Sequence, residues 1–275
     1  MIAAGATIGA LQASLPLDPL ENRILLCHAL GLSRVALITE SERVLTADEA
    51  SRLSAVVQRR QFGEPIAYIV GHREFFGLNF QVNDSVLIPR PDTELLVELA
   101  LDRLPRHGRL LDMGTGSGAI AVSVAHTRPD TAVTALDFSG AALDVARTNA
   151  NTHGAQVRFL RSDWFSNLDH ERFHLIASNP PYIASGDEHL SRGDLRFEPN
   201  MALTDQADGL SALRIIIGGA PAHLEHDGWL LLEHGYDQAA QVRELLEAHG
   251  YAEVQSWRDL AGIERVSGGR IVRND

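Results

Sequence analysis

The chain has 275 residues, 45% of them apolar and 22% charged, which is the composition of a globular protein with one large domain or two unequal ones. It contains no apolar stretch of the roughly 18 to 20 residues that cross a membrane, and it does not open with a signal-peptide pattern, so we expect a cytoplasmic protein that does not bind membranes. The single cysteine excludes an internal disulfide, the absence of lysine excludes Schiff-base chemistry, and the formal net charge of -12 disfavours direct binding to nucleic acid.

Residues 1–65 have the pattern of a small helical bundle. Asp18 and Pro19 are typical of a helix start, and Gly31 is typical of the end of that helix. A second helix is predicted from the capping box formed by Thr46 and Glu49. The buried face of the first helix is predicted to carry Leu20, Ile24 and Cys27.

Residues 66–90 are predicted to form a β-hairpin linker. The short runs AYIV, EFF, NFQV and SVLI have strand-like composition, and Gly71, Gly77 and Asn83-Asp84 separate them. After this linker, residues 91–275 alternate helical and strand patterns, which predicts an α/β domain.

The α/β domain contains a strand, LLDM, that runs into a glycine-rich turn and an apolar helix. The turn is Gly114-Thr115-Gly116-Ser117-Gly118, and it differs from the dinucleotide-binding spacing G-x-G-x-x-G. The acid before it, Asp112, would repel a pyrophosphate and suits a ligand with an ammonium group and a sulfonium. The turn therefore predicts S-adenosylmethionine as cofactor.

Two further strand ends carry groups that suit the same ligand. Asp137 ends the next strand, 21 residues after Gly116, the distance at which an acid meets ribose hydroxyls in such folds. Asp163 and Trp164 follow a third strand, where a carboxylate accepts from an adenine amino group and an indole covers the ring.

The stretch SNPPYI follows a fourth strand pattern, FHLIA. Pro180 and Pro181 keep the chain out of a helix, so the carbonyl oxygens here stay available as acceptors. The side-chain oxygen of Asn179 and the carbonyl of Pro180 are predicted to hold the two hydrogens of a substrate NH2 group, while Tyr182 supplies a flat wall. This arrangement predicts a clamp for a planar nitrogen.

Two other classes of function fit parts of the pattern. An exocyclic amine of a nucleic acid, of the N6-adenine type, would fit the same clamp, although the acidic composition disfavours it. A non-catalytic binding module would use the cofactor site only to support the fold. The twelve histidines do not form a metal-binding motif, and we expect no metal.

The sequence resembles the HemK/PrmC family of protein-(glutamine N5) methyltransferases along nearly its whole length. The resemblance is carried by EPIAYIVGHREFFGLNF, SVLIPRPDTELLVE, LLDMGTGSGAIAVSVA, DFSGAALDVARTNA, SNPPYI, FEPNMAL and DGWLLLEHGYDQ. It implies a Rossmann-like class I S-adenosylmethionine-dependent methyltransferase with a small N-terminal helical bundle and a β-hairpin linker.

The resemblance also implies an activity and roles for residues. The substrate would be the side-chain amide of the glutamine in the Gly-Gly-Gln loop of class I peptide-chain release factors, and the N-terminal bundle would help to engage that factor. The turn from Gly114 to Gly118, Asp137, Trp164 and Asn179 would line the cofactor site. The segment from Asn179 to Tyr182 would receive the glutamine, with Asn179, Pro180 and Tyr182 as the catalytic residues.

Overall fold

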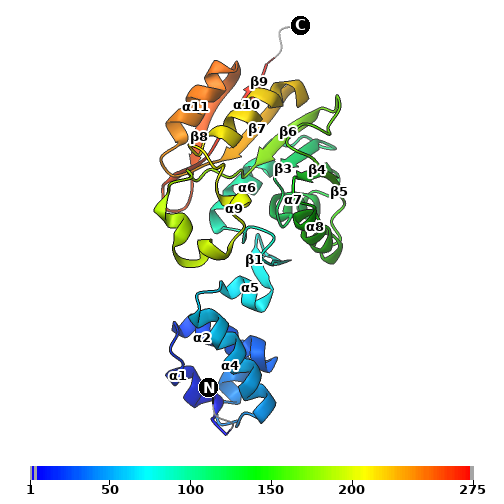
Figure 1. Ribbon diagram of the computed structural model, residues 1–275. Coiled ribbons are helices and arrows are strands. Elements are labelled where there is room, and N and C mark those ends of the chain that lie inside the picture. Colours follow the sequence, from blue (N-terminus) through cyan, green and yellow to red (C-terminus); the bar gives the residue numbers. More distant parts are fainter. Residues whose placement is uncertain (1, 3–4, 273–275) are drawn as a thin grey trace. The chain divides into compact units, whose positions relative to one another are not determined.

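The computed structural model describes residue 2 and residues 5–272. These residues form two compact units that divide between Gly71 and His72. Figure 1 labels many of the helices and strands of each unit.

The first unit is a bundle of helices with its own apolar core. Side chains from successive helices, among them Ile8, Leu25, Leu37 and Leu53, pack together in it. Its helices are α1 (Ile8–Ser14), α2 (Pro19–Leu30), α3 (Arg34–Thr39), α4 (Ala47–Gln61) and α5 (Ile66–Val70).

The predicted ends of the helices in this unit are confirmed. The predicted buried face of α2 is only partly correct, because Cys27 packs against the core whereas Leu20 does not. Asp18 accepts from the amide of Leu20 at the start of α2, and Gly31 ends the helix with a φ of 66°. Thr46 and Glu49 form the capping box of α4. Leu20 is 52% exposed, because α2 buries a different stripe of its apolar surface. That stripe consists of Asn22, Leu25, Leu26, Ala29 and Leu30.

The predicted hairpin is shorter than expected. Strands β1 (His72–Phe75) and β2 (Leu78–Gln81) pair antiparallel, but the run AYIV lies in helix α5 and not in a strand. Pro65 precedes that helix with a φ of -57°, and Gly71 ends it in the left-handed region. The run SVLI is not a strand either, because the amide of Ile88 is bound by the carboxylate of Glu198 and not by a neighbouring strand.

The second unit is built on a mixed seven-stranded sheet, as the α/β pattern predicts. The strand order is β5-β4-β3-β6-β7-β9-β8, and β9 runs antiparallel to both β7 and β8, whereas the other pairs are parallel. The strands are β3 (Arg109–Met113), β4 (Ala132–Asp137), β5 (Val157–Arg161), β6 (Phe173–Ser178), β7 (Leu224–Glu233), β8 (Tyr251–Arg258) and β9 (Glu264–Ile271).

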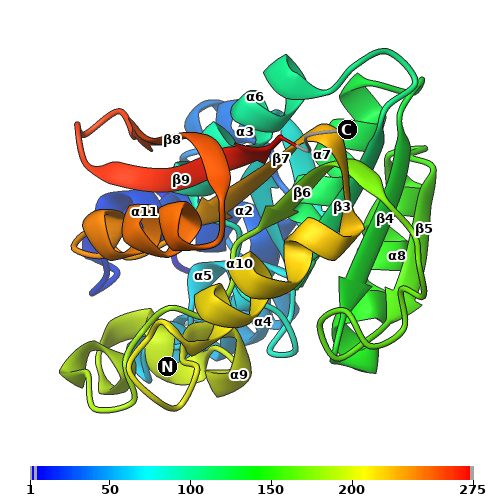
Figure 2. The same ribbon diagram turned by 90° about the horizontal axis from the view of Figure 1, so that it is seen from above.

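Helices cover both faces of this sheet (Figure 2). On one side lie α6 (Glu94–Arg103), α7 (Ala119–Thr127) and α8 (Gly140–Thr152), and on the other α10 (Ser211–His223) and α11 (Ala239–Ala248). Short helical turns complete the unit: η1 (Pro91–Thr93), η2 (Glu188–Ser191), η3 (Gly193–Phe197) and α9 (Asn200–Leu203).

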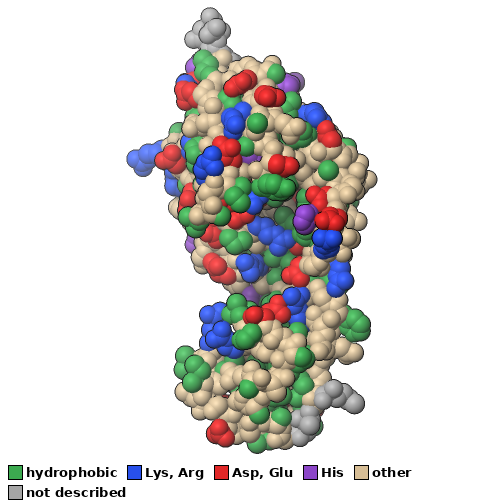
Figure 3. Space-filling view, turned by 90° about the vertical axis from the view of Figure 1, so that its left-hand side faces the viewer, with side chains coloured by type: hydrophobic (Ala, Val, Ile, Leu, Met, Phe, Trp, Pro, Cys, Tyr) green, Lys and Arg blue, Asp and Glu red, His purple; other side chains and the backbone are tan. Residues whose placement is uncertain are grey.

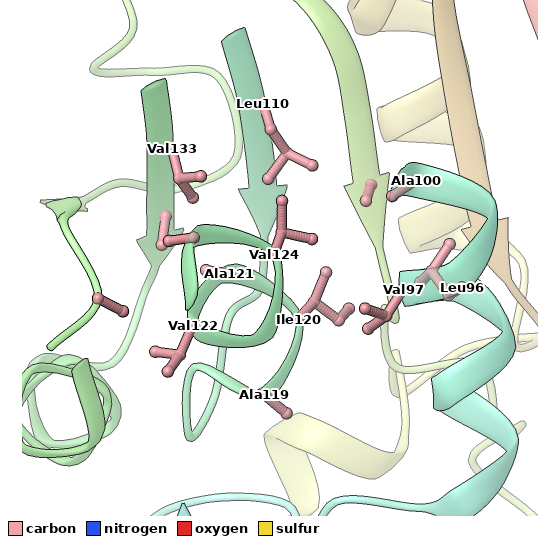
Figure 4. Close-up of a cluster of buried hydrophobic side chains, with 14 of the residues drawn as sticks. Leu96, Val97, Ala100, Leu110, Ala119, Ile120, Ala121, Val122, Val124 and Val133 are labelled. Carbon is pink, nitrogen blue, oxygen red and sulfur yellow. The ribbon is translucent and has the colours of Figure 1, made fainter. Parts of the chain in front are cut away.

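The two apolar cores of the unit follow from side chains that alternate between the faces of each strand. Leu110 belongs to the core under α6 and α7, and its neighbour Leu111 belongs to the core under α10 and α11. Figure 4 shows Ile120 and Val124 of α7 directed toward the sheet and α6 in the first of these cores. Because helices cover both faces of the sheet, a ligand is expected to bind at the carboxyl ends of the parallel strands.

Candidate functional site

The site lies where the direction of winding changes, between β3 and β6. From β3 the chain winds outward through β4 and β5, and β6 then returns to the other side of β3. Ligands of open α/β sheets bind at the carboxyl ends of the strands at such a point. Met113 pairs with Ser178, so Gly114 and Asn179 leave the sheet side by side.

A cavity of about 460 Å³ occupies this edge of the sheet. Most of the predicted site residues line it: Gly114, Thr115, Gly116, Ser117, Asp137, Asp163, Trp164, Asn179 and Pro181. The other four, Asp112, Gly118, Pro180 and Tyr182, are not part of its lining.

The glycine turn needs glycine at each of its three glycine positions. Gly114, Gly116 and Gly118 have φ values of 72°, 54° and 84°, in the left-handed region that other residues rarely adopt. A Cβ on Gly118 would also lie 3.1 Å from the Cβ of Ala146 on α8. The amides of Gly114 and Thr115 donate to the carbonyl of Leu136. These bonds hold the turn against the end of β4.

Asp112 lies beneath this turn and is completely buried. Its Oδ2 accepts from the Thr115 hydroxyl at 2.6 Å and from the amide of Ala121 at 3.1 Å. Its Oδ1 has no hydrogen-bond partner among the residues that the structure describes. Burial raises the pKa of this carboxyl to about 7, against the lowering effect of these two hydrogen bonds. An unpaired buried carboxylate oxygen fits a ligand that brings a cation or a hydrogen-bond donor.

Asp137 stands at the end of β4, with both carboxylate oxygens held by backbone amides. Oδ2 accepts from Gly116 at 2.9 Å and Oδ1 accepts from Ser139 at 2.8 Å. Burial raises the pKa of Asp137, while these bonds lower it. Each oxygen keeps a further lone pair for a ligand hydroxyl. The carboxylate thus orders the glycine turn and faces the cavity at the same time.

The sequence pattern did not single out several other residues of the cavity. Phe138 lines the cavity and is 53% exposed, and the strand-end rule that identified Asp137 also points to it. Met201 of α9 is another. A longer stretch of the lining comes from the segment before α6 and consists of Ser85, Val86, Leu87, Pro89, Arg90 and Thr93.

An ion pair between a partly exposed arginine and a buried glutamate joins two segments that line the cavity. Glu198 pairs with Arg90, and its other oxygen accepts from the amide of Ile88 at 3.0 Å. The Glu198 side chain is fully buried, and burial raises its pKa while Arg90 lowers it. This ion pair holds together, beside the cavity, the segments around Arg90 and Glu198, which are 108 positions apart in the sequence.

The segment after β6 is held by side chains from three other parts of the unit. Asn179 donates through Nδ2 to the hydroxyl of Thr93 at 3.1 Å. The Tyr182 hydroxyl donates to Glu233 at 3.3 Å, and the Tyr182 carbonyl accepts from Gln238 at 3.0 Å. The chain around Asn179 is therefore fixed from both sides, as a binding surface for a small planar group requires.

Two family models match the chain. The model of the PrmC N-terminal domain matches residues 7–71, and that of the methyltransferase small domain matches residues 91–194. A release factor glutamine methyltransferase of Burkholderia pseudomallei is 56% identical to this chain over an alignment of 275 positions. The alignment covers 97% of this chain and 96% of that protein. The chain belongs to the release factor glutamine methyltransferase family. The resemblance noted from the sequence motifs is thereby confirmed.

Solved structures support the fold of this family member. A methyltransferase from Pyrococcus furiosus superposes with a TM-score of 0.56 at 20% identity, over 80% of this chain and all of that chain. An rRNA methyltransferase of Thermus thermophilus, solved in complex with AdoMet and guanosine, gives a TM-score of 0.54 at 20% identity over 74% of this chain and 50% of that chain. The predicted class I methyltransferase fold is confirmed.

Within residue 2 and residues 5–272, no group of His, Cys, Asp and Glu side chains is arranged to hold a metal ion. In that same part of the chain, no helix has the length and apolar character to cross a membrane. Figure 3 shows acidic and basic side chains interspersed over the face in view.

Substitution of Gly209 tests whether the position of the Asn179–Tyr182 segment determines the activity of this family member. A Cβ at Gly209 would lie 2.5 Å from the carbonyl oxygen of Tyr182, at a φ of 80°. We expect Gly209→Ala to displace Tyr182 and lower the methyl-transfer rate by about 10-fold or more, because small displacements of positioning groups have large effects. Single-turnover assays would measure this. Gly186→Ala is the matched control, since its Cβ would meet no atom within 4 Å, and equal rates in the two variants would contradict the expectation.

Proposed function

We propose that this chain transfers a methyl group from S-adenosylmethionine to the side-chain amide nitrogen of the glutamine in the Gly-Gly-Gln loop of class I release factors. The observation that carries the proposal is the Asn179 side chain, which lines the cavity and donates to Thr93 through its NH2 group. The amide oxygen of Asn179 is then the atom left for a substrate. An acceptor in that place suits an amide hydrogen.

The residues that line the cavity, together with Asp112 beneath its glycine turn, fit S-adenosylmethionine. The unpaired oxygen of Asp112 suits its ammonium group, and the remaining lone pairs of Asp137 suit its ribose hydroxyls. Phe138 and Trp164 offer apolar surface for the adenine, and Asp163 offers an acceptor for its amino group. The cofactor supplies a methyl group activated on a sulfonium.

The protein must supply orientation, because the amide nitrogen of glutamine is a weak nucleophile. Its lone pair is drawn into the carbonyl by resonance, as in a peptide bond. In the proposal, the oxygens of Asn179 and Pro180 accept the two amide hydrogens, and Tyr182 forms a wall beside the amide plane. Orientation of this kind contributes about 7 kcal/mol or more to lowering a barrier.

The direct test is mass spectrometry of the Gly-Gly-Gln peptide from a release factor incubated with this protein and S-adenosylmethionine. We expect one added methyl group on the glutamine. A parallel incubation with RNA and DNA tests the adenine-amine alternative. Methylation of nucleic acid with an unmodified release factor would overturn the proposal.

The role of Asp137 is tested by its replacement with alanine. A hydrogen bond to a charged group contributes about 1.5 to 3 kcal/mol, so Asp137→Ala should weaken S-adenosylmethionine binding about 10- to 100-fold. Isothermal titration calorimetry measures the affinity, and thermal unfolding controls for the lost bonds to Gly116 and Ser139. An unchanged affinity in a folded variant would remove Asp137 from the cofactor site.

A further inference from the structure

The proposed cofactor carries an anionic group for which the three acids of the site offer no partner. S-adenosylmethionine has a carboxylate beside its ammonium group, whereas Asp112, Asp137 and Asp163 suit cations and hydrogen-bond donors. A carboxylate that leaves water for a protein cavity needs a cation or hydrogen-bond donors in exchange. The wall of the cavity is therefore expected to contain a basic group.

Arg90 is the single basic residue that lines the cavity within the part of the chain that the structure describes. Its side chain is 33% exposed, and its Nη2 pairs with Glu198. That bond uses one of the five N–H donors of a guanidinium. The other donors have the planar geometry that binds a carboxylate through two parallel hydrogen bonds.

The order of the strands determines at which side of the cavity Arg90 lies. Asp137 ends β4 and Asp163 follows β5, and both strands lie on one side of β3. Asn179 follows β6, on the other side of β3. Asn179 donates to the hydroxyl of Thr93, whose amide donates to the carbonyl of Arg90 at 3.1 Å. Arg90 therefore lies on the same side of the cavity as the proposed clamp.

This side of the cavity is where the amino-acid portion of the cofactor is expected. The proposed positions of the ribose at Asp137 and of the adenine at Asp163 leave the sulfonium and the amino-acid portion to extend toward β3 and β6. The methyl group must also face Asn179 for transfer. The carboxylate, which lies at the end of the molecule opposite the adenine, then reaches the side that carries Arg90.

Glu198 holds the guanidinium of Arg90 in one position. Glu198 does not line the cavity, and its side chain is fully buried. Its second carboxylate oxygen accepts from the amide of Ile88 at 3.0 Å, so both of its oxygens are bound. An arginine held in this way has its remaining donors oriented before a ligand arrives, which lowers the cost of binding.

We propose that Arg90 binds the carboxylate of S-adenosylmethionine, and that Glu198 is the positioning residue that keeps the guanidinium at the wall of the cavity. The inference rests on the proposed function, because it concerns the cofactor of that reaction. It adds a requirement for an anionic group at the end of the ligand opposite its adenine. The site should therefore discriminate between the cofactor and the same molecule without its carboxylate.

Decarboxylated S-adenosylmethionine is the probe for this discrimination, because it keeps the sulfonium, the amine and the nucleoside. Isothermal titration calorimetry with the full chain should show that it binds about 10- to 100-fold more weakly than S-adenosylmethionine, the effect expected of hydrogen bonds between charged groups. Arg90→Gln should weaken the binding of S-adenosylmethionine by the same factor. It should change the affinity for the decarboxylated molecule by less than about 3-fold.

The comparison of the two ligands separates binding by Arg90 from a merely structural role. Loss of the ion pair with Glu198 could alter the shape of the cavity, but such a change would weaken both ligands alike. Arg192→Gln is the matched control, because Arg192 pairs with Glu188 at 2.7 Å on the surface and does not line the cavity. It should leave both affinities unchanged.

Arg90→Lys serves as a second variant if Arg90→Gln does not fold. Lysine keeps a positive charge beside Glu198 but lacks the planar fork that binds two carboxylate oxygens at once. The preference for S-adenosylmethionine over the decarboxylated molecule should therefore fall by about 3- to 10-fold. An unchanged preference in a folded Arg90→Lys variant would contradict the proposed two-bond contact.

Two results would overturn the inference as a whole. One is an unmodified protein that binds the two ligands equally well, and the other is an Arg90→Gln variant in which the ratio of the two affinities is unchanged. Failure of the proposed function is distinguishable from both, because the unmodified protein would then leave the release factor glutamine without a methyl group, whatever its preference between the ligands.

Discussion

Asn179→Ala should slow single-turnover methyl transfer to the release factor by about 100-fold or more. The substitution removes the oxygen proposed to accept a substrate hydrogen, and it leaves that hydrogen without its acceptor. Loss of a positioned polar group of this kind costs about 2.7 to 4 kcal/mol in other enzymes. The measurement is quenched-flow transfer of a labelled methyl group at saturating cofactor.

Two controls separate this effect from others at the same site. Asn179 lines the cavity, so cofactor affinity must be measured in the same variant. Asn151→Ala removes an exposed asparagine side chain from α8 in the same unit and should leave the rate unchanged. A folded Asn179→Ala protein with normal affinity and full activity would exclude the clamp mechanism.

The residues at strand ends were predictable from the sequence. In a parallel sheet the carboxyl ends of the strands share one edge, so a glycine turn after β3, an acid ending β4 and an asparagine after β6 fall together without knowledge of the coordinates. The residue types then indicate the ligand. Gly116, Asp137 and Asn179 could all be assigned to one cavity in this way.

Thr93 and Glu233 were not predictable, because their roles depend on which strands are neighbours. Glu233 lies beside Asn179 only because β7 pairs with β6, and periodicity in the chain does not specify that pairing. Thr93 precedes Asn179 by 86 residues and reads as part of a helix start. Thr93 accepts a hydrogen bond from Asn179, and Glu233 accepts one from the Tyr182 hydroxyl.

Short apolar runs were also ambiguous. The run AYIV has strand-like composition, but it forms the short helix α5, which Pro65 precedes and Gly71 ends. In α2 the apolar run ILLC occupies most of the helix circumference, so spacing alone does not determine which side faces the core. The position of the neighbouring helices decides it, and Leu25 and Leu26 are buried in place of Leu20.

The unit before His72 is proposed to engage the release factor. Its side chains form a core of their own, and the two cores of the remaining chain contain no residue before Phe75. The separate family model of the PrmC N-terminal domain, which matches residues 7–71, supports a distinct role for this unit. The residues that line the cavity, from Ser85 to Ala202, belong to the second unit.

Deletion of residues 1–71 should therefore lower kcat/KM for an intact release factor by about 100-fold, the equivalent of about 2.8 kcal/mol of lost docking energy. S-adenosylmethionine affinity should stay the same, because every lining residue of the cavity remains. A short peptide that carries the Gly-Gly-Gln sequence is the decisive control. Because the peptide has no surface for the deleted unit to engage, its methylation should be equally slow with the full and the shortened chain. A folded, cofactor-binding truncation that methylates the intact factor at the full rate would show that the unit has another purpose.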